Sequence, residues 1–261
     1  MIRKLVKKIP GSTWLNNLML EKQVMRNFLN CSAKELDQAK FYKQFIKRND
    51  LVFDVGCNVG CRTKLFLNLG ARVVAFEPQP ELCEHLHSHL KRNKMFTLEK
   101  SAIGTEKGYA EMRISEAHVL SSMSSRWIEA TKKSGRFQQY EWNKSIQVEV
   151  TTFDKAIHKH GLPQFVKIDV EGFELDVMKG LSHQVPYLSF EFTAEDICNT
   201  YNCIKHLSNL GKYEFRISKA ESFIMEPNDW VDNKEIKKRI GQLISDDSLS
   251  WGDVYAKRTC T

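Results

Sequence analysis

The sequence has no long apolar run, and this absence excludes a conventional membrane-spanning helix, which needs about 20 consecutive apolar residues. Glycine and proline are scarce, with 13 and 6 residues among 261, so the chain is neither collagen-like nor of low complexity. The seven cysteines are odd in number and dispersed, which indicates a reducing compartment rather than a secreted disulfide framework. The N-terminus also lacks the continuous apolar core of a signal peptide. Together these absences predict a cytoplasmic, globular protein.

The formal net charge of +7 is concentrated at one end of the chain. Residues 1–50 contain 11 Lys and Arg against 4 Asp and Glu, whereas residues 51–261 carry equal numbers of both signs. Such a basic segment can contact nucleic acid or an anionic membrane surface, but a solvated arm explains it more simply. We therefore predict a basic helical N-terminal extension over residues 1–48 and one domain over residues 49–261.

Short apolar runs and helical patterns alternate along this domain. The pattern predicts strands over residues 51–56, 72–78, 96–104, 165–170, 187–192, 213–217 and 253–257, and helices over residues 33–48, 81–91, 152–160, 173–179 and 194–210, with a further helix ending at Gly70. Alternating strands and helices are typical of an α/β fold with a doubly wound, mostly parallel sheet. Residues 105–150 interrupt this rhythm with a Ser-rich, basic and aromatic stretch, which predicts a lid-like insertion with strands over 109–114 and 146–150.

The first predicted strand runs into a glycine-containing turn, Asp54-Val-Gly56-Cys-Asn58-Val-Gly60. In an open parallel sheet, ligands bind outside the carboxyl ends of the strands, and the glycines let the backbone approach a ligand closely. A dinucleotide fingerprint would need glycine where Asn58 stands, and a phosphate-binding P-loop would need lysine where Cys61 follows Gly60. The pattern instead suits S-adenosylmethionine, which has no pyrophosphate. An ordinary strand-to-helix turn is the alternative interpretation.

A second signal lies at the end of the next predicted strand. Glu77 follows Gly56 by 21 residues. A carboxylate at this point of the fold can accept hydrogen bonds from both hydroxyls of a ribose. The glycine turn and this acid together predict a nucleoside-binding site.

The sequence resembles the FkbM family of S-adenosylmethionine-dependent methyltransferases. The matching stretches are LVFDVGCNVG at 51–60, VAFEP at 74–78, VTTFD at 150–154 and KIDVEGFE at 167–174. The resemblance covers about residues 50–192, and Cys57 departs from it, since the family commonly has alanine there. It implies a class I Rossmann-like domain with a seven-stranded sheet and S-adenosylmethionine as the methyl donor. The implied reaction is O-methylation of a hydroxyl on a sugar, glycan or related small molecule.

The resemblance also implies roles for individual residues. The cofactor would be bound by Asp54, Gly56, Asn58, Gly60, Glu77, Pro78, Ser101, Ala102 and Asp169. Of these, Glu77 would hold the ribose, Ser101 and Ala102 would lie along the adenine, and Asp169 would lie beside the methionine end and the acceptor.

An alcohol is a poor nucleophile, so a general base is expected to assist methyl transfer. Asp169, Glu171 and Glu191 are the candidates, because they lie at the carboxyl ends of neighbouring predicted strands. We predict no metal site, although the same carboxylates could bind Mg²⁺ through their oxygens. An alternative role for Glu171 or Glu174 is to cap the helix that starts near Gly172.

Four residues of the predicted insertion are candidate contacts for the acceptor. His118 is a further candidate for the base or for an acceptor contact. Arg126, Trp127, Arg136 and Trp142 could stack on a sugar or, alternatively, pack the lid. Two other functions stay open, namely RNA methylation, which the basic extension favours, and a non-catalytic module that keeps the fold. The oligomeric state and the acceptor are not predicted by the sequence.

Overall fold

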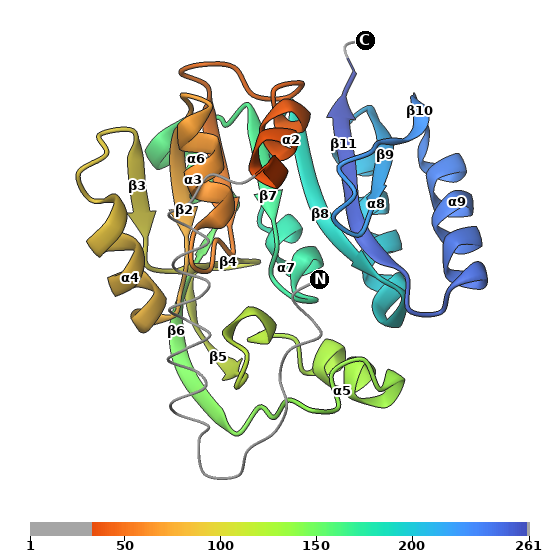
Figure 1. Cartoon of the computed structure of the whole chain (residues 1–261), viewed down its shortest axis with the longest axis horizontal. Helices are drawn as coiled ribbons and strands as arrows, with labels where there is room; N and C mark the ends of the chain where they lie inside the picture. The colour runs from red at the N-terminus through yellow and green to blue at the C-terminus, as the bar shows by residue number, and fades with distance from the viewer. Residues whose placement is uncertain (1–32, 260–261) are drawn as a thin grey trace.

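The described part of the chain, residues 33–259 of a computed structural model with side chains from residue 36, contains a main sheet of eight strands (Figure 1). The strands lie in the order β3-β2-β1-β7-β8-β11-β9-β10. Their bounds are β1 Leu51–Val55, β2 Arg72–Phe76, β3 Phe96–Glu99, β7 Phe165–Ile168, β8 Tyr187–Thr193, β9 Tyr213–Lys219, β10 Glu226–Val231 and β11 Trp251–Arg258. A smaller sheet, in the order β4-β6-β5, joins β4 Ala102–Gly104, β5 Gly108–Ile114 and β6 Lys144–Thr152.

The main sheet is doubly wound. Strands β3, β2, β1, β7 and β8 are parallel to one another, whereas β11 is antiparallel to both β8 and β9, and β10 is antiparallel to β9. The chain builds outward from β1 to β3 on one side and from β7 to β8 on the other, so the strand order reverses between β1 and β7. The predicted α/β fold class is thus confirmed.

Helices cover both faces of the sheet (Figure 1). Adjacent residues of β1 point to opposite faces, so Val52 belongs to a core cluster with residues of α2 and α3, and Phe53 to another cluster that includes residues of α6, α7, α8 and α9. A strand buried on both sides needs a continuous apolar sequence, which explains the run at the start of the domain. The helices are α2 Ala33–Tyr42, α3 Cys61–Asn68, α4 Pro80–Leu90, α6 Phe153–His160, α7 Glu174–Lys179, α8 Ile197–Leu210 and α9 Asn233–Asp246.

The sheet has one strand more than the seven that were expected. The additional strand, β10, lies at the edge, and its sequence EPNDWV contains proline, asparagine and aspartate, which strands usually lack. The following helix α9 was also not predicted, although Asp232 caps its first turn by accepting from the backbone N–H groups of Lys234 and Glu235.

The expected strand over residues 96–104 is two strands in two sheets. Strand β3 ends at Glu99, and β4 begins at Ala102 and pairs with β6 instead of continuing along β2. The break lies at Lys100 and Ser101, where the chain leaves the main sheet. This change of sheet attaches the insertion to the rest of the domain.

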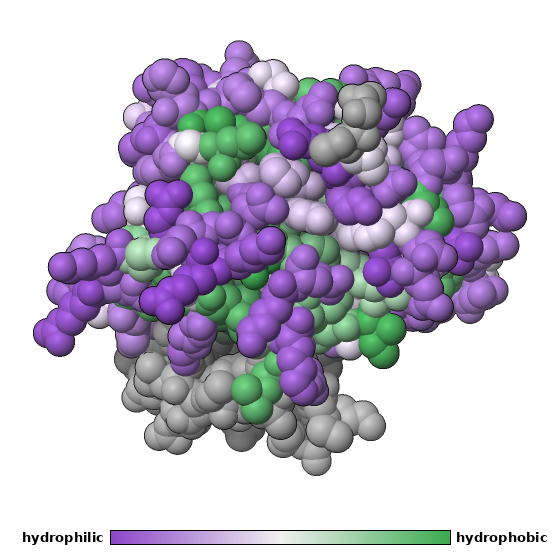
Figure 2. Space-filling model, turned by 90° about the horizontal axis from the view of Figure 1, so that it is seen from above, coloured by the Kyte–Doolittle hydropathy of each residue, from purple (hydrophilic) through white to green (hydrophobic). Residues whose placement is uncertain are grey.

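The insertion, residues 105–150, contains a helix that the sequence pattern did not reveal. Helix α5 (Ser125–Ser134) follows a short 3₁₀ helix, η2 (His118–Leu120), and begins where the Ser124 side chain accepts a hydrogen bond from the Trp127 N–H. Seen from above, hydrophilic side chains cover much of the surface, and apolar side chains gather in smaller patches (Figure 2). Among residues 33–259, no helix has both the length and the apolarity to cross a membrane. The basic segment over residues 1–32 lies outside the described residues.

Candidate active site

A cavity of about 1000 Å³ opens at the carboxyl ends of β1, β2 and β7. This is where the strand order reverses, which is the position where open α/β sheets bind ligands. Its volume is at the upper end of the roughly 300–1,000 Å³ typical of small-molecule sites. The predicted site residues that line it are Asp54, Gly56, Asn58, Glu77, Pro78, Ala102, Asp169 and Glu171.

The turn after β1 has three residues in the left-handed region. The φ angles are 78° at Gly56, 53° at Asn58 and 84° at Gly60. Asparagine tolerates this conformation because its side chain can bond locally, and here its Oδ1 accepts from the Val59 N–H at 2.8 Å. Gly60 is the residue before α3 and supports the turn without itself lining the cavity.

Gly56 brings the turn against the end of β7. A Cβ atom added at Gly56 would lie 1.9 Å from the carbonyl oxygen of Asp169. No side chain fits this space, and the positive φ adds further strain. Gly56 therefore allows the turn after β1 to lie directly against Asp169 at the end of β7.

We expect Gly56→Ala to lower the free energy of unfolding by about 2–4 kcal/mol, from left-handed strain and steric overlap together. Urea denaturation measures this change. Gly108→Ala is the matched control, because nothing lies within 4 Å of a Cβ at that position and its φ is not in the left-handed region. Equal stability of the two variants would contradict the close approach.

Asp54 fixes the start of α3 on β1. Its side chain is 1% exposed, and Oδ2 accepts from the Thr63 hydroxyl at 2.6 Å. Burial raises the pKa of Asp54 to about 6. The residue thus lines the cavity and also connects two elements that form its wall.

Glu77 faces the glycine turn from the end of β2. It is 2% exposed, its Oε2 accepts from the Asn58 N–H and its Oε1 from the Gln79 N–H, both at 2.9 Å. Burial raises its pKa to about 7. An ionised carboxylate has about four lone-pair positions, so each oxygen of Glu77 can still accept a hydrogen bond from a hydroxyl group. Pro78 follows directly and lines the same wall.

The residues after β3 do not all face the cavity. Ala102 and Ile103 line it, whereas Ser101 lines a separate cavity of about 260 Å³ together with Glu99 and Lys155. The expected adenine contact of Ser101 therefore has no support in this geometry, because the chain turns toward the small sheet at this point. The apolar Ile103 lies where such a contact was expected and was not singled out from the sequence.

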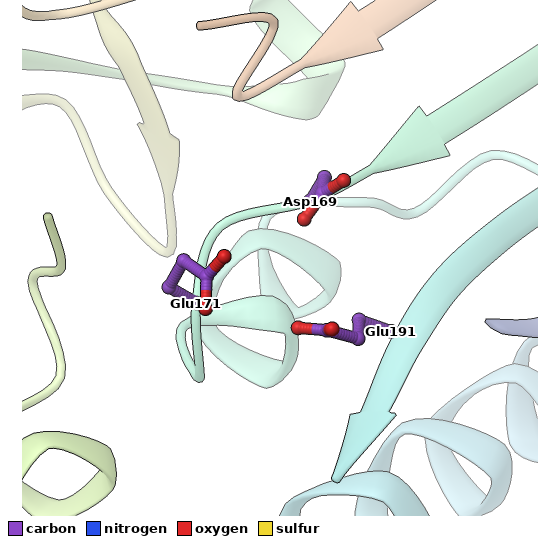
Figure 3. Close-up of side chains that lie close together, drawn as sticks. All are labelled: Asp169, Glu171 and Glu191. Carbon is purple, nitrogen blue, oxygen red and sulfur yellow. The ribbon is translucent and has the colours of Figure 1, made fainter. Parts of the chain in front are cut away.

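Three carboxylates converge beside the carboxyl end of β7 (Figure 3). Asp169 follows β7, Glu171 lies in the next turn, and Glu191 comes from β8. One oxygen of each lies within 4.8 Å of the others. Asp169 and Glu171 line the main cavity, while Glu191 lines a small space of about 10 Å³ shared with Trp127 and Asn199. The predicted convergence is present, but Glu191 lies behind the other two.

A buried cation supports this cluster from β7. The Lys167 side chain is 3% exposed, and its Nζ lies 3.2 Å from Asp169 Oδ2 and 2.9 Å from Asp253 Oδ1. Burial lowers the pKa of Lys167, but the charges of Asp169 and Asp253 outweigh this and raise it well above its usual range. Lys167 therefore remains charged and holds Asp169, whose side chain is 41% exposed, at the cavity wall.

The two glutamates of the cluster lie close to other carboxylates. Burial and then the neighbouring carboxylates raise the pKa of both Glu171 and Glu191 well above the usual glutamate range. These two glutamates thus hold protons to a higher pH than isolated carboxyl groups would. Oxygen atoms so arranged could also hold a divalent cation, although the Lys167 ammonium already supplies a positive charge beside Asp169.

The four insertion residues considered as acceptor contacts are engaged within the protein: the two tryptophans are buried and the two arginines form ion pairs. Trp127 and Trp142 are 1% and 6% exposed, and the Trp142 Nε1–H donates to the Leu120 carbonyl. Arg126 pairs with Asp196, and Arg136 pairs with Glu195. None of these four side chains belongs to the described lining of the main cavity, so packing accounts for them.

Other parts of the insertion do reach the cavity. The sequence analysis named His118, whose pKa burial lowers, but missed the apolar residues around it. Met112, Val119 and Met123 also line the cavity, as does the polar Gln38 from α2. Only the length of the interruption in the α/β rhythm pointed to this wall, because its residues lack a regular spacing.

We expect the free energy of unfolding of the ligand-free protein to fall by about 1–3 kcal/mol between pH 5 and 7.5. Burial raises the pKa of Glu174 to about 7, like that of Glu77, so the folded state binds more protons than the unfolded state in this interval. Stability then decreases as pH rises. Urea denaturation at both pH values measures the change, Glu174→Gln should flatten it, and a rise in stability would contradict these pKa directions.

The fold and the site together define a class of protein. A doubly wound sheet carries a glycine turn after β1 and an acid after β2 at the reversal of strand order, and this arrangement is typical of Rossmann-like nucleoside-binding domains. The chain belongs to the FkbM methyltransferase family, since the profile of the methyltransferase FkbM domain matches residues 54–202.

Two relatives are known as methyltransferases. The chain is 24% identical over 185 residues to the 2-O-methyltransferase NoeI of Sinorhizobium fredii, which covers 66% of this chain and 75% of NoeI. It is 24% identical over 163 residues to the hexuronic acid methyltransferase AglP of Haloferax volcanii, which covers 60% of each protein. The match to AglP thus spans less than two thirds of that relative.

Among solved structures, precorrin-6y C5,15-methyltransferase from Geobacter metallireducens is similar with a TM-score of 0.45 and 10% sequence identity. The similarity covers 86% of this chain and 89% of that structure.

Proposed function

We propose that this protein binds S-adenosylmethionine in the main cavity and transfers its methyl group to a hydroxyl of a sugar or glycan. The observation that carries the proposal is one cavity lined by acidic groups from the two strands that flank β1. Glu77 follows β2 and contacts the glycine turn, whereas Asp169 and Glu171 follow β7. A ribose-binding acid and acids suited to proton removal thus line the same cavity from different strands.

The residues present fit the cofactor. Gly56 leaves no room for a side chain beside Asp169, and Glu77 keeps lone pairs free for hydroxyl groups. In the proposal, the ribose and methionine portions are surrounded by Asp54, Gly56, Asn58, Glu77 and Pro78, while Gly60 supports the turn from outside the cavity. Ala102 and Ile103 contact the adenine. When bound, the cofactor supplies an electrophilic methyl group on a sulfonium.

The chain itself supplies alignment and a base. Holding the acceptor oxygen in line with the methyl group can lower the barrier by roughly 7–11 kcal/mol. Asp169 is the proposed base, because it faces the cavity and Lys167 contacts its Oδ2. Its carboxylate would take the hydroxyl proton while the methyl carbon exchanges its bond to sulfur for a bond to the hydroxyl oxygen. General-base assistance of this kind typically contributes about 10²–10⁴-fold.

A sugar acceptor is supported by the printed activities of the relatives. NoeI is a 2-O-methyltransferase, and AglP methylates a hexuronic acid. At 24% identity this supports a carbohydrate hydroxyl as the class of acceptor without selecting one sugar. RNA is the second candidate, favoured by the concentration of basic residues in the first fifth of the chain.

The decisive experiment measures cofactor binding and methyl transfer separately. Calorimetry with S-adenosylmethionine tests the cavity, and radiolabelled transfer onto nucleotide-sugars, oligosaccharides and RNA tests the acceptor. Mild base cleaves methyl esters. Label that is found on a carbohydrate and survives this treatment supports the proposal. Label on RNA alone supports the second candidate, and cofactor binding without transfer to any acceptor points to a non-catalytic module.

We also propose that residues 49–261 form the catalytic domain, with residues 1–48 as an extension and residues 105–150 as an inserted acceptor wall. A cytoplasmic location is part of the proposal. It is supported by the odd number and the dispersed positions of the seven cysteines, which favour a reducing compartment.

A further inference from the structure

The turn after β7 has an unusual backbone. Glu171 has a φ of 52° and Gly172 a φ of 89°, so two consecutive residues are left-handed. This conformation is ordinary for glycine but costly for glutamate. Such residues persist where the surrounding structure holds them, and they concentrate at functional sites. The contacts that hold Glu171 therefore bear on the position of its carboxylate.

One of these contacts comes from the insertion. The Ser122 hydroxyl donates to the carbonyl oxygen of Glu171 at 2.6 Å, and Ser122 is 1% exposed. Its own backbone exchanges two hydrogen bonds with Arg113 of β5, at 2.9 and 3.0 Å. The hydroxyl is thus attached to the small sheet and reaches across to the turn after β7.

A second contact presses on the next residue. A Cβ atom added at Gly172 would lie 2.3 Å from Cβ of Trp127, so the indole side chain packs directly on the glycine backbone. On the opposite side, the Gly172 N–H donates to Glu174 Oε1 at 3.0 Å. The turn is therefore enclosed between the insertion and the first residue of α7.

The insertion is itself fixed to the domain beyond this turn. Arg126 contacts Asp196 at 2.9 Å, and Arg136 Nη2 contacts Glu195 Oε2 at 3.0 Å. Both acidic residues belong to the 3₁₀ helix η3 (Ala194–Asp196), which follows β8, the strand that carries Glu191. The part of the insertion after β5 is thus held by contacts with both β5 and η3, and it supports the turn that carries Glu171.

We propose that Ser122 and Trp127 are positioning residues that hold the Glu171–Gly172 turn so that the Glu171 carboxylate stays within the cluster formed with Asp169 and Glu191. The insertion is then a structural part of the active site, in addition to forming a wall of the acceptor cavity. This inference rests on the proposed function, because the cluster is its proton-accepting end.

The kinetic test uses Ser122→Ala, which removes the donor to Glu171. We expect kcat to fall about 10–100-fold with unchanged affinity for S-adenosylmethionine, since a displacement of roughly 1 Å can cost about 10²-fold. In a Glu171→Gln background the same substitution should cause little further loss, because the two residues act through one carboxylate. Equal losses in both backgrounds would overturn the inference.

Further variants separate positioning from general stability. Ser134→Ala removes a hydroxyl at the end of α5, in the same insertion. This hydroxyl contacts the Thr131 carbonyl and Glu195 instead of Glu171, so the variant should keep kcat near that of the wild type. Ser122→Thr retains the hydroxyl and should restore activity. If Ser122→Ala does not fold, Ser122→Cys keeps the volume and replaces a strong donor with a weak one, with the same expected loss of kcat.

A measurement without turnover separates this inference from the proposed function. Carbon-13 titration of the Glu171 carboxyl should show a midpoint changed by at least half a pH unit in Ser122→Ala and unchanged in Ser134→Ala. The charged groups facing Glu171 are Lys167 of β7, Asp169 directly after this strand, Glu174 of α7, Glu191 of β8 and Arg136 of the insertion. An unchanged midpoint would overturn the positioning role, whereas a wild-type protein without methyl transfer would overturn the proposed function alone.

Discussion

Replacing Asp169 with asparagine should lower the rate of methyl transfer by about 10²–10⁴-fold. The substitution keeps the size of the side chain but removes the proton acceptor that faces the cavity beside Lys167. The affinity for S-adenosylmethionine should change little, because Glu77 and the glycine turn remain. Single-turnover transfer of a labelled methyl group, together with calorimetry, measures both quantities.

The control for this prediction is Asp176→Asn on α7. Asp176 is a partly exposed carboxylate paired with Lys179, outside the described lining of the main cavity, and its loss should leave the rate unchanged. If Asp169→Asn retained full activity across pH 6–9, Asp169 would not be the base, and Glu171→Gln would become the variant to measure.

The second large effect is expected at Glu77, which lines the cavity from the end of β2. Glu77→Ala should weaken binding of S-adenosylmethionine by about 1–3 kcal/mol, or about 5–150-fold, because two charge-assisted hydrogen bonds to the ribose are lost. The substitution also removes the acceptors of the Asn58 and Gln79 N–H groups, so the glycine turn itself should loosen. Isothermal calorimetry measures the affinity.

Two variants distinguish these effects. Glu77→Gln keeps one acceptor oxygen and the side-chain volume, so it should lose affinity less than Glu77→Ala. Glu81→Ala, on the exposed first turn of α4, should bind like the wild type. Full affinity in Glu77→Ala would exclude the ribose-binding role.

Much of the nucleoside-binding half of the site could be predicted from sequence because it is local. The turn from Asp54 to Gly60 and the acid at Glu77 each follow directly from a buried strand, and parallel neighbouring strands bring their carboxyl ends together. The convergence of Glu191 on Asp169 follows from the same rule, since β7 and β8 are parallel neighbours. Alternation of apolar strands and helices was sufficient for these features.

The other half depends on contacts between distant segments. Lys167 meets Asp253 because the last strand, β11, enters the sheet between β8 and β9, and no local pattern predicts that order. Ser101 turns away from the cavity because the chain changes sheets after β3. Ser122 reaches Glu171 across 49 residues of sequence through an irregular segment. Periodicity reports which residues are buried, but it does not report which distant residue each one contacts.

The borders of the main sheet also bear on how copies of this protein can meet. One outer strand, β3, has four residues, and the other, β10, contains Pro227, which has no N–H to donate. Short or proline-bearing outer strands resist the addition of a strand from another molecule. Any self-assembly of this enzyme should therefore use other surfaces, and the main sheet should not extend from one molecule into the next.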